Sequence, residues 1–367
     1  MYFCQKFYLL NANHFIPKNT VFKTLNQGVV TAKAPSNIAL VKYWGKEKNQ
    51  IPKNPSISFT LSACFTQTTV KFKKKSEINT FAIEVFFEGK KHDSFIPKIL
   101  TFFERIEKYI PFLKHYSFSI ETRNSFPHSS GIASSASGMA ALSLCLMQIE
   151  KQLNTNLVDD YILKKASFLA RLGSGSASRS IENGIVVWGK HPKIKGSSDL
   201  FGIPFPYTIH ENFKNYHDTI LLVDKGEKTV SSTVGHQLME NHPFANVRFE
   251  QANNNMIAIK NILQNGAIKQ FINIVESEAL TLHGLMMSSN PYFILMKPNT
   301  LEIIQKIWKF RKDTNLPISF TLDAGANVHV LYPEKDRIAI HKFIVSDLIE
   351  HCQNNHYICD RVSFDEK

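Results

Sequence analysis

Alternation of apolar and polar residues predicts strands in the first half of the chain. Tyr116, Phe118 and Ile120 alternate with serine and glutamate, the period of a strand with one buried face. Runs rich in β-branched and aromatic residues predict further strands at residues 56–65, 68–72, 81–87 and 184–188. Residues 29–41 mix β-branched and small residues, and the folded domain is expected to begin there.

Apolar residues spaced three and four apart predict helices. Met139, Leu142, Leu146, Ile149 and Leu153 follow this spacing. Another helical pattern opens at Pro97 and runs to about residue 110. In the second half of the chain, helices are expected around residues 243–265, 268–288, 299–313 and 335–351, with strands at 219–223, 318–322 and 327–332. No internal repeat or low-complexity tract interrupts these patterns.

A stretch rich in Lys, Pro, Gly and Ser at residues 190–215 divides the chain. We place the domain boundary there, with an N-terminal domain at residues 29–205 and a C-terminal domain at 206–367. Residues 1–28 contain a brief apolar patch but no signal-peptide architecture. We interpret them as a loose extension, or as an upstream start, that is dispensable for catalysis.

Composition and charge narrow the class of protein. With 367 residues, 43% of them hydrophobic and 20% charged, the chain suits one large or two closely packed domains. The formal net charge of +12 is compatible with nucleic acid, a membrane surface or an anionic small molecule as partner. The basic residues are dispersed and no nucleic-acid recognition signature accompanies them, which favours the small molecule. No apolar stretch is long enough to span a bilayer.

The five cysteines are odd in number, widely spaced and without a CxxC pair. This pattern argues against a disulfide framework and a zinc site, and it favours a reducing, cytoplasmic compartment. His128, His236, His283 and His329 show no metal-ligand spacing either. We interpret these histidines as structural or surface residues.

Two Ser- and Gly-rich loops are candidate anion-binding sites. Residues 127–135 lead into a helix, where backbone N–H groups and the helix N-terminus favour a phosphate. A simple helix N-cap is the alternative interpretation. Residues 173–179 form a second loop ending in Arg179, whose guanidinium suits a carboxylate or phosphate, although it could also be solvated at a turn. Neither GxxxxGK[ST] nor GxGxxG after a strand occurs in the chain.

Three further residues could carry chemistry. Lys42 and Lys46 lie on either side of Tyr43, Trp44 and Gly45, and their ammonium groups suit an oligophosphate. Exposed lysines at the end of a strand are the alternative. Asp323 follows the predicted strand at 318–322, where an aspartate is usually a turn former. It would act as a general base if it lay beside a substrate hydroxyl.

These segments occur in an order that resembles one family. APSNIA at residues 34–39, KYWGK at 42–46, FPHSSGIASSASG at 126–138, GSGSASRS at 173–180 and LDAGANV at 322–328 follow the order of the diphosphomevalonate decarboxylases. That family belongs to the superfamily of galactokinase, homoserine kinase, mevalonate kinase and phosphomevalonate kinase. The pattern at 127–136 is typical of the superfamily, whereas KYWGK, GSGSASR and LDAG are typical of the decarboxylases. The resemblance covers roughly residues 30–335.

The resemblance implies an α+β, two-domain small-molecule kinase fold. Its N-terminal half would be similar to ribosomal protein S5 domain 2, and its C-terminal half would be ferredoxin-like. The implied reaction is the ATP-dependent decarboxylation of mevalonate diphosphate to isopentenyl diphosphate. ATP with Mg²⁺ would be the co-substrate, no residue is assigned as a metal ligand, and a homodimer is expected.

The resemblance also assigns roles by position. Asp323 would act on the tertiary hydroxyl of the substrate, Arg179 would hold its carboxylate, and Lys42 would lie near the transferred phosphoryl group. The residues expected to bind the substrate are Tyr43, Trp44, Gly45, Lys46, Lys98, Ser174, Gly175, Ser176, Ala177, Ser178, Ser232 and Thr233. The residues expected to bind ATP are Ser58, Ser129, Gly131, Ser134 and Ser135.

Departures from the family pattern leave alternatives open. Lys98 falls where many relatives have a diphosphate-binding arginine, and the turn reads AGAN in place of AGPN. A decarboxylase of mevalonate 5-phosphate and a mevalonate 3-kinase-like enzyme that stops after phosphorylation are therefore alternatives. A nucleic-acid-binding protein would also account for the charge, but the missing recognition motif argues against it. We expect neither a nucleic-acid nor a membrane partner.

Overall fold

A computed structural model describes residues 11–17, 23–78, 80–127, 132–226, 232–362 and 364 of the chain. Its first half contains a seven-stranded sheet built around the long antiparallel strands β1 (Gln27–Val41) and β2 (Ser56–Lys74). β1 pairs with β2 along nearly its whole length. The remaining strands are β3 (Ala82–Phe87), β4 (Lys90–Lys91), β5 (Tyr116–Asn124), β6 (Ile185–Trp188) and β7 (Ile203–Pro204), in the order β4-β3-β5-β2-β6-β7.

The two strands expected at residues 56–65 and 68–72 form the single strand β2, so that prediction is wrong in detail. The predicted gap fell at residues 66–67, but the side chains of Thr66 and Thr68 are both buried. The Thr66 hydroxyl lies 2.6 Å from that of Ser137 and the Thr68 hydroxyl 3.0 Å from that of Thr122. Satisfied hydroxyl groups can be buried in a sheet, so the ladder with β5 continues through these residues.

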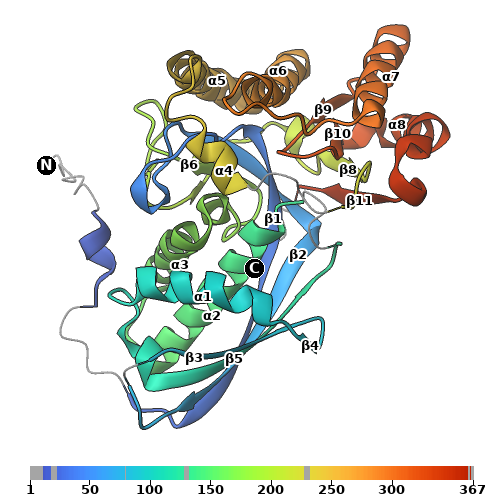
Figure 1. Ribbon diagram of the computed structural model, residues 1–367. Helices are drawn as coiled ribbons and strands as arrows, with labels where there is room; N and C mark the ends of the chain where they lie inside the picture. The colour runs from blue at the N-terminus through green and yellow to red at the C-terminus, as the bar shows by residue number, and fades with distance from the viewer. Residues whose placement is uncertain are drawn as a thin grey trace, which may run out of the picture.

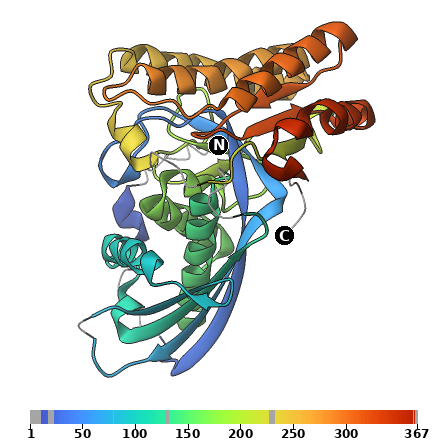
Figure 2. The ribbon, with the colours of Figure 1, turned by 45° about the vertical axis from the view of Figure 1, so that its right-hand side comes forward.

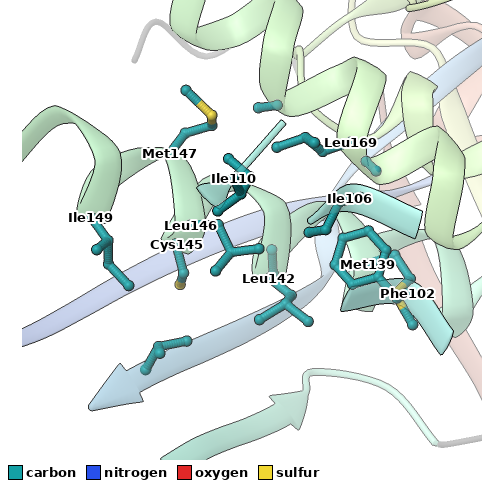
Figure 3. Packing of buried hydrophobic residues seen from close by; sticks show 14 of the residues in the cluster. Phe102, Ile106, Ile110, Met139, Leu142, Cys145, Leu146, Met147, Ile149 and Leu169 are labelled. Atoms are coloured by element: carbon teal, nitrogen blue, oxygen red, sulfur yellow. The ribbon is translucent and has the colours of Figure 1, made fainter. Parts of the chain in front are cut away.

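Three helices cover one face of this sheet: α1 (Ile96–Ile106), α2 (Ser134–Leu153) and α3 (Asp159–Gly173) (Figures 1 and 2). The sequence predicted α1 and α2 but not α3. Figure 3 shows the core that they form, in which Phe102 and Ile106 of α1 lie near Met139 and Leu142 of α2 and Leu169 of α3. The apolar spacing that predicted α2 therefore marks its buried face, and Cys145 is part of the same core.

The second half contains a four-stranded antiparallel sheet with the order β11-β8-β10-β9. Its strands are β8 (His217–Leu221), β9 (Ser319–Thr321), β10 (Val328–Tyr332) and β11 (Tyr357–Arg361). The helices are α4 (Ser232–Gln237), α5 (Ala245–Asn265), α6 (Ile268–Met287), α7 (Pro298–Thr314) and α8 (Arg337–Phe343). The predicted strands and long helices are present, but the helix expected at 335–351 continues past α8 as a π-helical turn and a 3₁₀ turn. The sequence did not predict β11.

The two halves share a hydrophobic core. Ile38 and Phe59 of the large sheet belong to the same cluster as Ile220, Met256 and Phe271 of the second half. The division into domains 29–205 and 206–367 falls between β7 and β8 and stays a prediction. None of the helices in the described part of the chain is long and apolar enough to cross a membrane.

Part of the N-terminal segment packs on the core. Ala12–Phe15 form a 3₁₀ turn, and the Phe15 side chain is 1% exposed. Its ring stacks on that of Phe168, with 4.6 Å between centroids, and meets Phe201 edge to face. Burial of a phenylalanine contributes to the stability of the fold. The interpretation of residues 1–28 as a loose extension is therefore wrong for Ala12–Phe15.

Candidate functional site

A cavity of about 620 Å³ is lined by residues from both halves of the chain. The segment after β1, the start of α2, the loop after α3, helix α4 and the turn after β9 all contribute. Of the residues that the sequence singled out, those lining the cavity are Lys42, Tyr43, Trp44, Lys46, Lys98, Ser134, Ser135, Ser174, Gly175, Ser176, Arg179 and Asp323. Segments up to 281 residues apart in the sequence thus meet around one space.

Lys42 and Asp323 form an ion pair in this cavity. Lys42 directly follows β1, and Asp323 lies in the turn between β9 and β10. The Lys42 ammonium donates to Oδ1 of Asp323 at 3.1 Å, with the lysine side chain 2% exposed and the aspartate 29% exposed. Burial lowers the pKa of Lys42, and the carboxylate of Asp323 partly offsets this effect. The pair therefore presents a carboxylate to the cavity beside a buried cation.

Two charged residues that sequence reasoning missed hold the backbone of Lys42. The guanidinium of Arg248 on α5 binds both carboxylate oxygens of Glu278 on α6, at 2.7 and 2.6 Å. Glu278 accepts a hydrogen bond from the Lys42 N–H at 2.8 Å, and Arg248 donates to the Lys42 carbonyl at 2.9 Å. Both side chains are buried. The two helices of the second half thereby fix a catalytic candidate of the first half.

Arg179 lies at the end of a 3₁₀ turn, Gly175–Arg179, that follows α3. Its side chain donates to Ser56 Oγ at 2.6 Å and to Asn37 Oδ1 at 3.3 Å. Burial lowers the pKa of Arg179 to about 10, and the negative charge of Asp323 opposes this shift. The guanidinium therefore remains protonated at neutral pH and supplies a second buried cation to the cavity.

The two Ser-rich loops meet at the cavity. Ser135, near the start of α2, lies with its hydroxyl 3.2 Å from that of Ser174, which follows α3. Ser129 and Gly131 lie outside the described residues. The structure does not place Ala177 and Ser178 at the cavity, because Ala177 belongs to the hydrophobic core and the Ser178 hydroxyl donates to the Gly175 carbonyl at 2.9 Å.

Of four other predicted residues, two do not line the cavity and two have side chains that are not described. Ser58 is fully buried in β2, opposite Ala39, and does not line the cavity. Ser232 and Thr233 begin α4, but their side chains are not among those described. Gly45 does not line the cavity either. Its backbone N–H donates a hydrogen bond to His236 Nδ1 at 3.0 Å, so Gly45 supports a residue that does line the cavity.

Two histidines that the sequence analysis interpreted as structural or surface residues belong to the site. His236 lines the cavity next to Tyr43 and Trp44. His283 donates from Nε2 to the Asp323 carbonyl at 3.1 Å and so supports the turn that contains Asp323. Burial lowers the pKa of His236 to about 3 and that of His283 to about 4, so both rings are neutral at pH 7. His329, by contrast, is buried against Asp218 and is structural.

The far end of the cavity combines apolar side chains with the polar Thr122 and Asn124 of β5. The apolar side chains there come from β3, α1, β5 and α2 and are Val85, Phe87, Ile99, Ile120, Met139 and Leu142. Lys98 lies at the same end, on the first turn of α1. The cavity thus combines a cationic end, around Lys42 and Arg179, with an end that contains several apolar side chains.

No three acidic, histidine or cysteine side chains come together as a metal site within the described ranges. Mg²⁺ usually keeps several waters and is held by substrate phosphates with one or two protein oxygens. The hydroxyls of Ser134 and Ser135 are among the oxygen groups of the cavity that could accompany nucleotide phosphates in this role. These residues are compatible with a magnesium ion that enters together with a nucleotide.

Comparison with known proteins identifies relatives of the whole fold. Residues 34–199 match the diphosphomevalonate decarboxylase-like N-terminal domain, and residues 219–365 match the mevalonate 5-diphosphate decarboxylase C-terminal domain. The diphosphomevalonate decarboxylase of Ganoderma lucidum is 30% identical over 326 residues, which cover 84% of this chain and 79% of the relative.

Solved structures of the same family are similar to this chain over most of its length. Mevalonate diphosphate decarboxylase from Staphylococcus aureus is similar with a TM-score of 0.78 at 28% identity, covering 92% of this chain and 96% of that one. A complex of MDDEF with MVAPP, AMPPCP and magnesium is similar with a TM-score of 0.77 at 28% identity, covering 92% and 97%.

The fold and the cavity together define a two-domain enzyme of the small-molecule kinase type, and the expected fold class is confirmed. Within that class, the chain belongs to the diphosphomevalonate decarboxylase family.

Proposed function

We propose that this protein converts mevalonate 5-diphosphate and ATP into isopentenyl diphosphate, CO2, ADP and phosphate. The observation that carries the proposal is the meeting of Lys42, Asp323 and Arg179 in one cavity. A kinase needs a base and a phosphate-binding cation, whereas a decarboxylase also needs a group that holds the carboxylate. Membership of the decarboxylase family supports the same reaction.

The chemistry follows from the leaving group. A tertiary alcohol beside a carboxylate does not lose CO2 readily, because hydroxide leaves poorly. In the proposed reaction Asp323 accepts the proton of the substrate's tertiary hydroxyl while the hydroxyl oxygen attacks the γ-phosphoryl group of ATP. The phosphate group of the resulting ester then leaves with the electron pair of its C–O bond, and the carbon–carboxylate bond supplies the pair that forms the alkene as CO2 leaves. Lys42 would stabilise the transferred phosphoryl group, and Arg179 would orient the carboxylate.

The cavity offers a place for each reactant. We assign the Ser134 and Ser135 hydroxyls and the apolar end to ATP, whose phosphates would bring Mg²⁺. A structural relative is described as a complex with AMPPCP and magnesium, which supports this use of the cavity. Tyr43, Lys46, Ser174 and Ser176 are assigned to the diphosphate substrate.

A homodimer and a cytoplasmic location complete the proposal. The first rests on the family resemblance and the second on the cysteine pattern. Sedimentation at several protein concentrations tests the homodimer, and a monomer at all concentrations would contradict it. Fractionation of the source cells tests the location, and recovery of the protein in the membrane fraction would contradict it.

Comparison of mevalonate 5-diphosphate with mevalonate 5-phosphate tests the substrate. A second phosphate adds charge near Lys46, whose ammonium is half-buried at the cavity. We expect kcat/KM to favour the diphosphate more than tenfold, which is about 1.4 kcal/mol. Lys46→Ala should reduce this preference, whereas Lys309→Ala, which removes an equal charge from an exposed position, should not. Equal rates with both substrates, or faster turnover of the monophosphate, would refute the diphosphate assignment.

A further inference from the structure

We propose that His236 is a substrate-binding residue whose Nε2–H donates a hydrogen bond to a phosphoryl oxygen of the anionic substrate. The inference rests on the proposed function, because it assumes that a phosphorylated substrate occupies the cationic end of the cavity. It gives the side chain a role in selecting that substrate, beyond the residues that the family motifs single out.

The His236 ring is held in place on two sides. Its centroid lies 4.3 Å from that of Tyr43 and 4.7 Å from that of Trp44, and both of those side chains line the same cavity. Gly235 makes this packing possible, since a Cβ at that position would lie 2.5 Å from Cη2 of Trp44. Helix α4 therefore approaches the indole closely, and the imidazole enters the cavity wall in one orientation.

One hydrogen bond fixes which ring nitrogen carries the proton. The backbone N–H of Gly45 can only donate, and it lies 3.0 Å from His236 Nδ1. Nδ1 must therefore be the acceptor, and the proton of the neutral ring is on Nε2. Within the described part of the chain, Nε2 of His236 takes part in no hydrogen bond. The ring thus keeps one donor for a ligand.

The surroundings keep this donor neutral. Burial is the largest cause of the lowered pKa of His236, and the positive charges of Lys46 and Arg179 lower it further. A neutral donor adds a hydrogen bond to an anionic oxygen without adding a third positive charge beside Lys46 and Arg179. Hydrogen bonds to charged groups contribute more than those between neutral groups, and removal of this one should weaken substrate binding about tenfold to a hundredfold.

Three variants separate the donor from the ring. Gln places an amide N–H near the position of Nε2, whereas Asn places its amide near Nδ1 and leaves the cavity without the donor. Phe keeps the ring between Tyr43 and Trp44 but has neither nitrogen. His236→Asn and His236→Phe should therefore lose the affinity, and His236→Gln should recover most of it.

Isothermal titration of each variant with mevalonate 5-diphosphate, without ATP, measures the effect directly. We expect Kd to rise about tenfold or more for His236→Asn and His236→Phe and by less than about threefold for His236→Gln. ATP affinity should stay unchanged in all three. If His236→Asn binds as tightly as the wild type while both remain folded, the inference is wrong but the proposed function stands. If the wild type itself binds no mevalonate 5-diphosphate, the proposed function fails and the inference fails with it.

A measurement on the unaltered protein does not depend on how the variants fold. In a nitrogen-15 NMR spectrum of histidine-labelled enzyme at pH 7, His236 should show a protonated Nε2 and an unprotonated Nδ1. Addition of mevalonate 5-diphosphate should shift the Nε2–H proton signal downfield. A ring protonated on Nδ1, or an Nε2–H signal unchanged by saturating substrate, would overturn the inference.

Discussion

Replacement of Asp323 by Asn removes the proposed base while keeping the shape of its side chain. Asn cannot accept the hydroxyl proton, and general bases typically contribute about 10²–10⁴-fold to the rate. We therefore expect kcat to fall at least about 100-fold, which is about 2.7 kcal/mol of transition-state stabilisation. The same change removes the charge that keeps the pKa of Lys42 from falling further. Both effects act on the phosphoryl-transfer step.

The cost to the fold should be smaller than the cost to the rate. Loss of one partner of a fully buried pair destabilises a protein by about 3–5 kcal/mol. Asp323 is 29% exposed, and the side-chain oxygen of an Asn could still accept a hydrogen bond from Lys42. We therefore expect the free energy of unfolding to fall by only about 1–2 kcal/mol.

Steady-state release of ADP, thermal unfolding and ATP binding, measured on one preparation, separate these effects. Asp313→Asn is the matched control, because that carboxylate is 52% exposed in a surface pair with Lys309. It should leave kcat and stability unchanged. A folded Asp323→Asn enzyme with near-normal kcat would refute the assignment of the base.

Three further perturbations test other parts of the structure. Glu278→Gln leaves the buried Arg248 charge without its partner, and we expect a loss of about 3–5 kcal/mol in the free energy of unfolding, measured in urea. Phe15→Ala should cost about 3–5 kcal/mol in the same assay, because the ring lies in the hydrophobic core. His283 has a folded pKa of about 4 against 6.5 for the free side chain, so the unfolded chain binds its proton first as the pH falls. Its stabilising contribution is present above pH 6.5 and is lost toward pH 4, and His283→Gln should make the decline of stability between these values shallower.

Each of these predictions has a control. Asp313→Asn breaks only an exposed ion pair and should change stability by less than about 0.5 kcal/mol, so an equal effect of Glu278→Gln would contradict the role of the buried pair. Tyr292→Ala truncates an aromatic side chain that is 79% exposed. A stability of Phe15→Ala equal to that of Tyr292→Ala would mean that the N-terminal turn does not pack on the core. An unchanged pH dependence in His283→Gln would show that this ring is charged or exposed in the native protein.

The sequence predicted the parts of the site that reside in local motifs. Lys42, Arg179 and Asp323 were found because each stands in a segment that resembles its family counterpart, and the structure brings all three to one cavity. Arg248 and Glu278 were missed, since charged residues in a helix usually face solvent. One signal was available: Arg248 precedes Ala252 and Met256 at a spacing of four, so it falls on the buried face of α5.

Other features depended on contacts that no local pattern contains. The role of His236 arises only where α4 lies against Tyr43 and Trp44, about 190 residues earlier in the chain. The packing of Phe15 depends on Phe168 of α3, a helix that the sequence analysis did not predict. The apolar spacing of Ile162, Ala166 and Leu169 could have indicated that helix, because all three residues lie on its buried face.

The central claim is that phosphorylation and decarboxylation occur on the same substrate. Incubation of the purified protein with ATP, Mg²⁺ and mevalonate 5-diphosphate labelled at its carboxylate allows ADP, phosphate and labelled CO2 to be counted together. The account predicts one CO2 and one free phosphate for each ADP formed, with isopentenyl diphosphate as the remaining product. ADP formed without CO2 would show a kinase that stops at the phosphorylated intermediate, and no ATP-dependent turnover would contradict the account altogether.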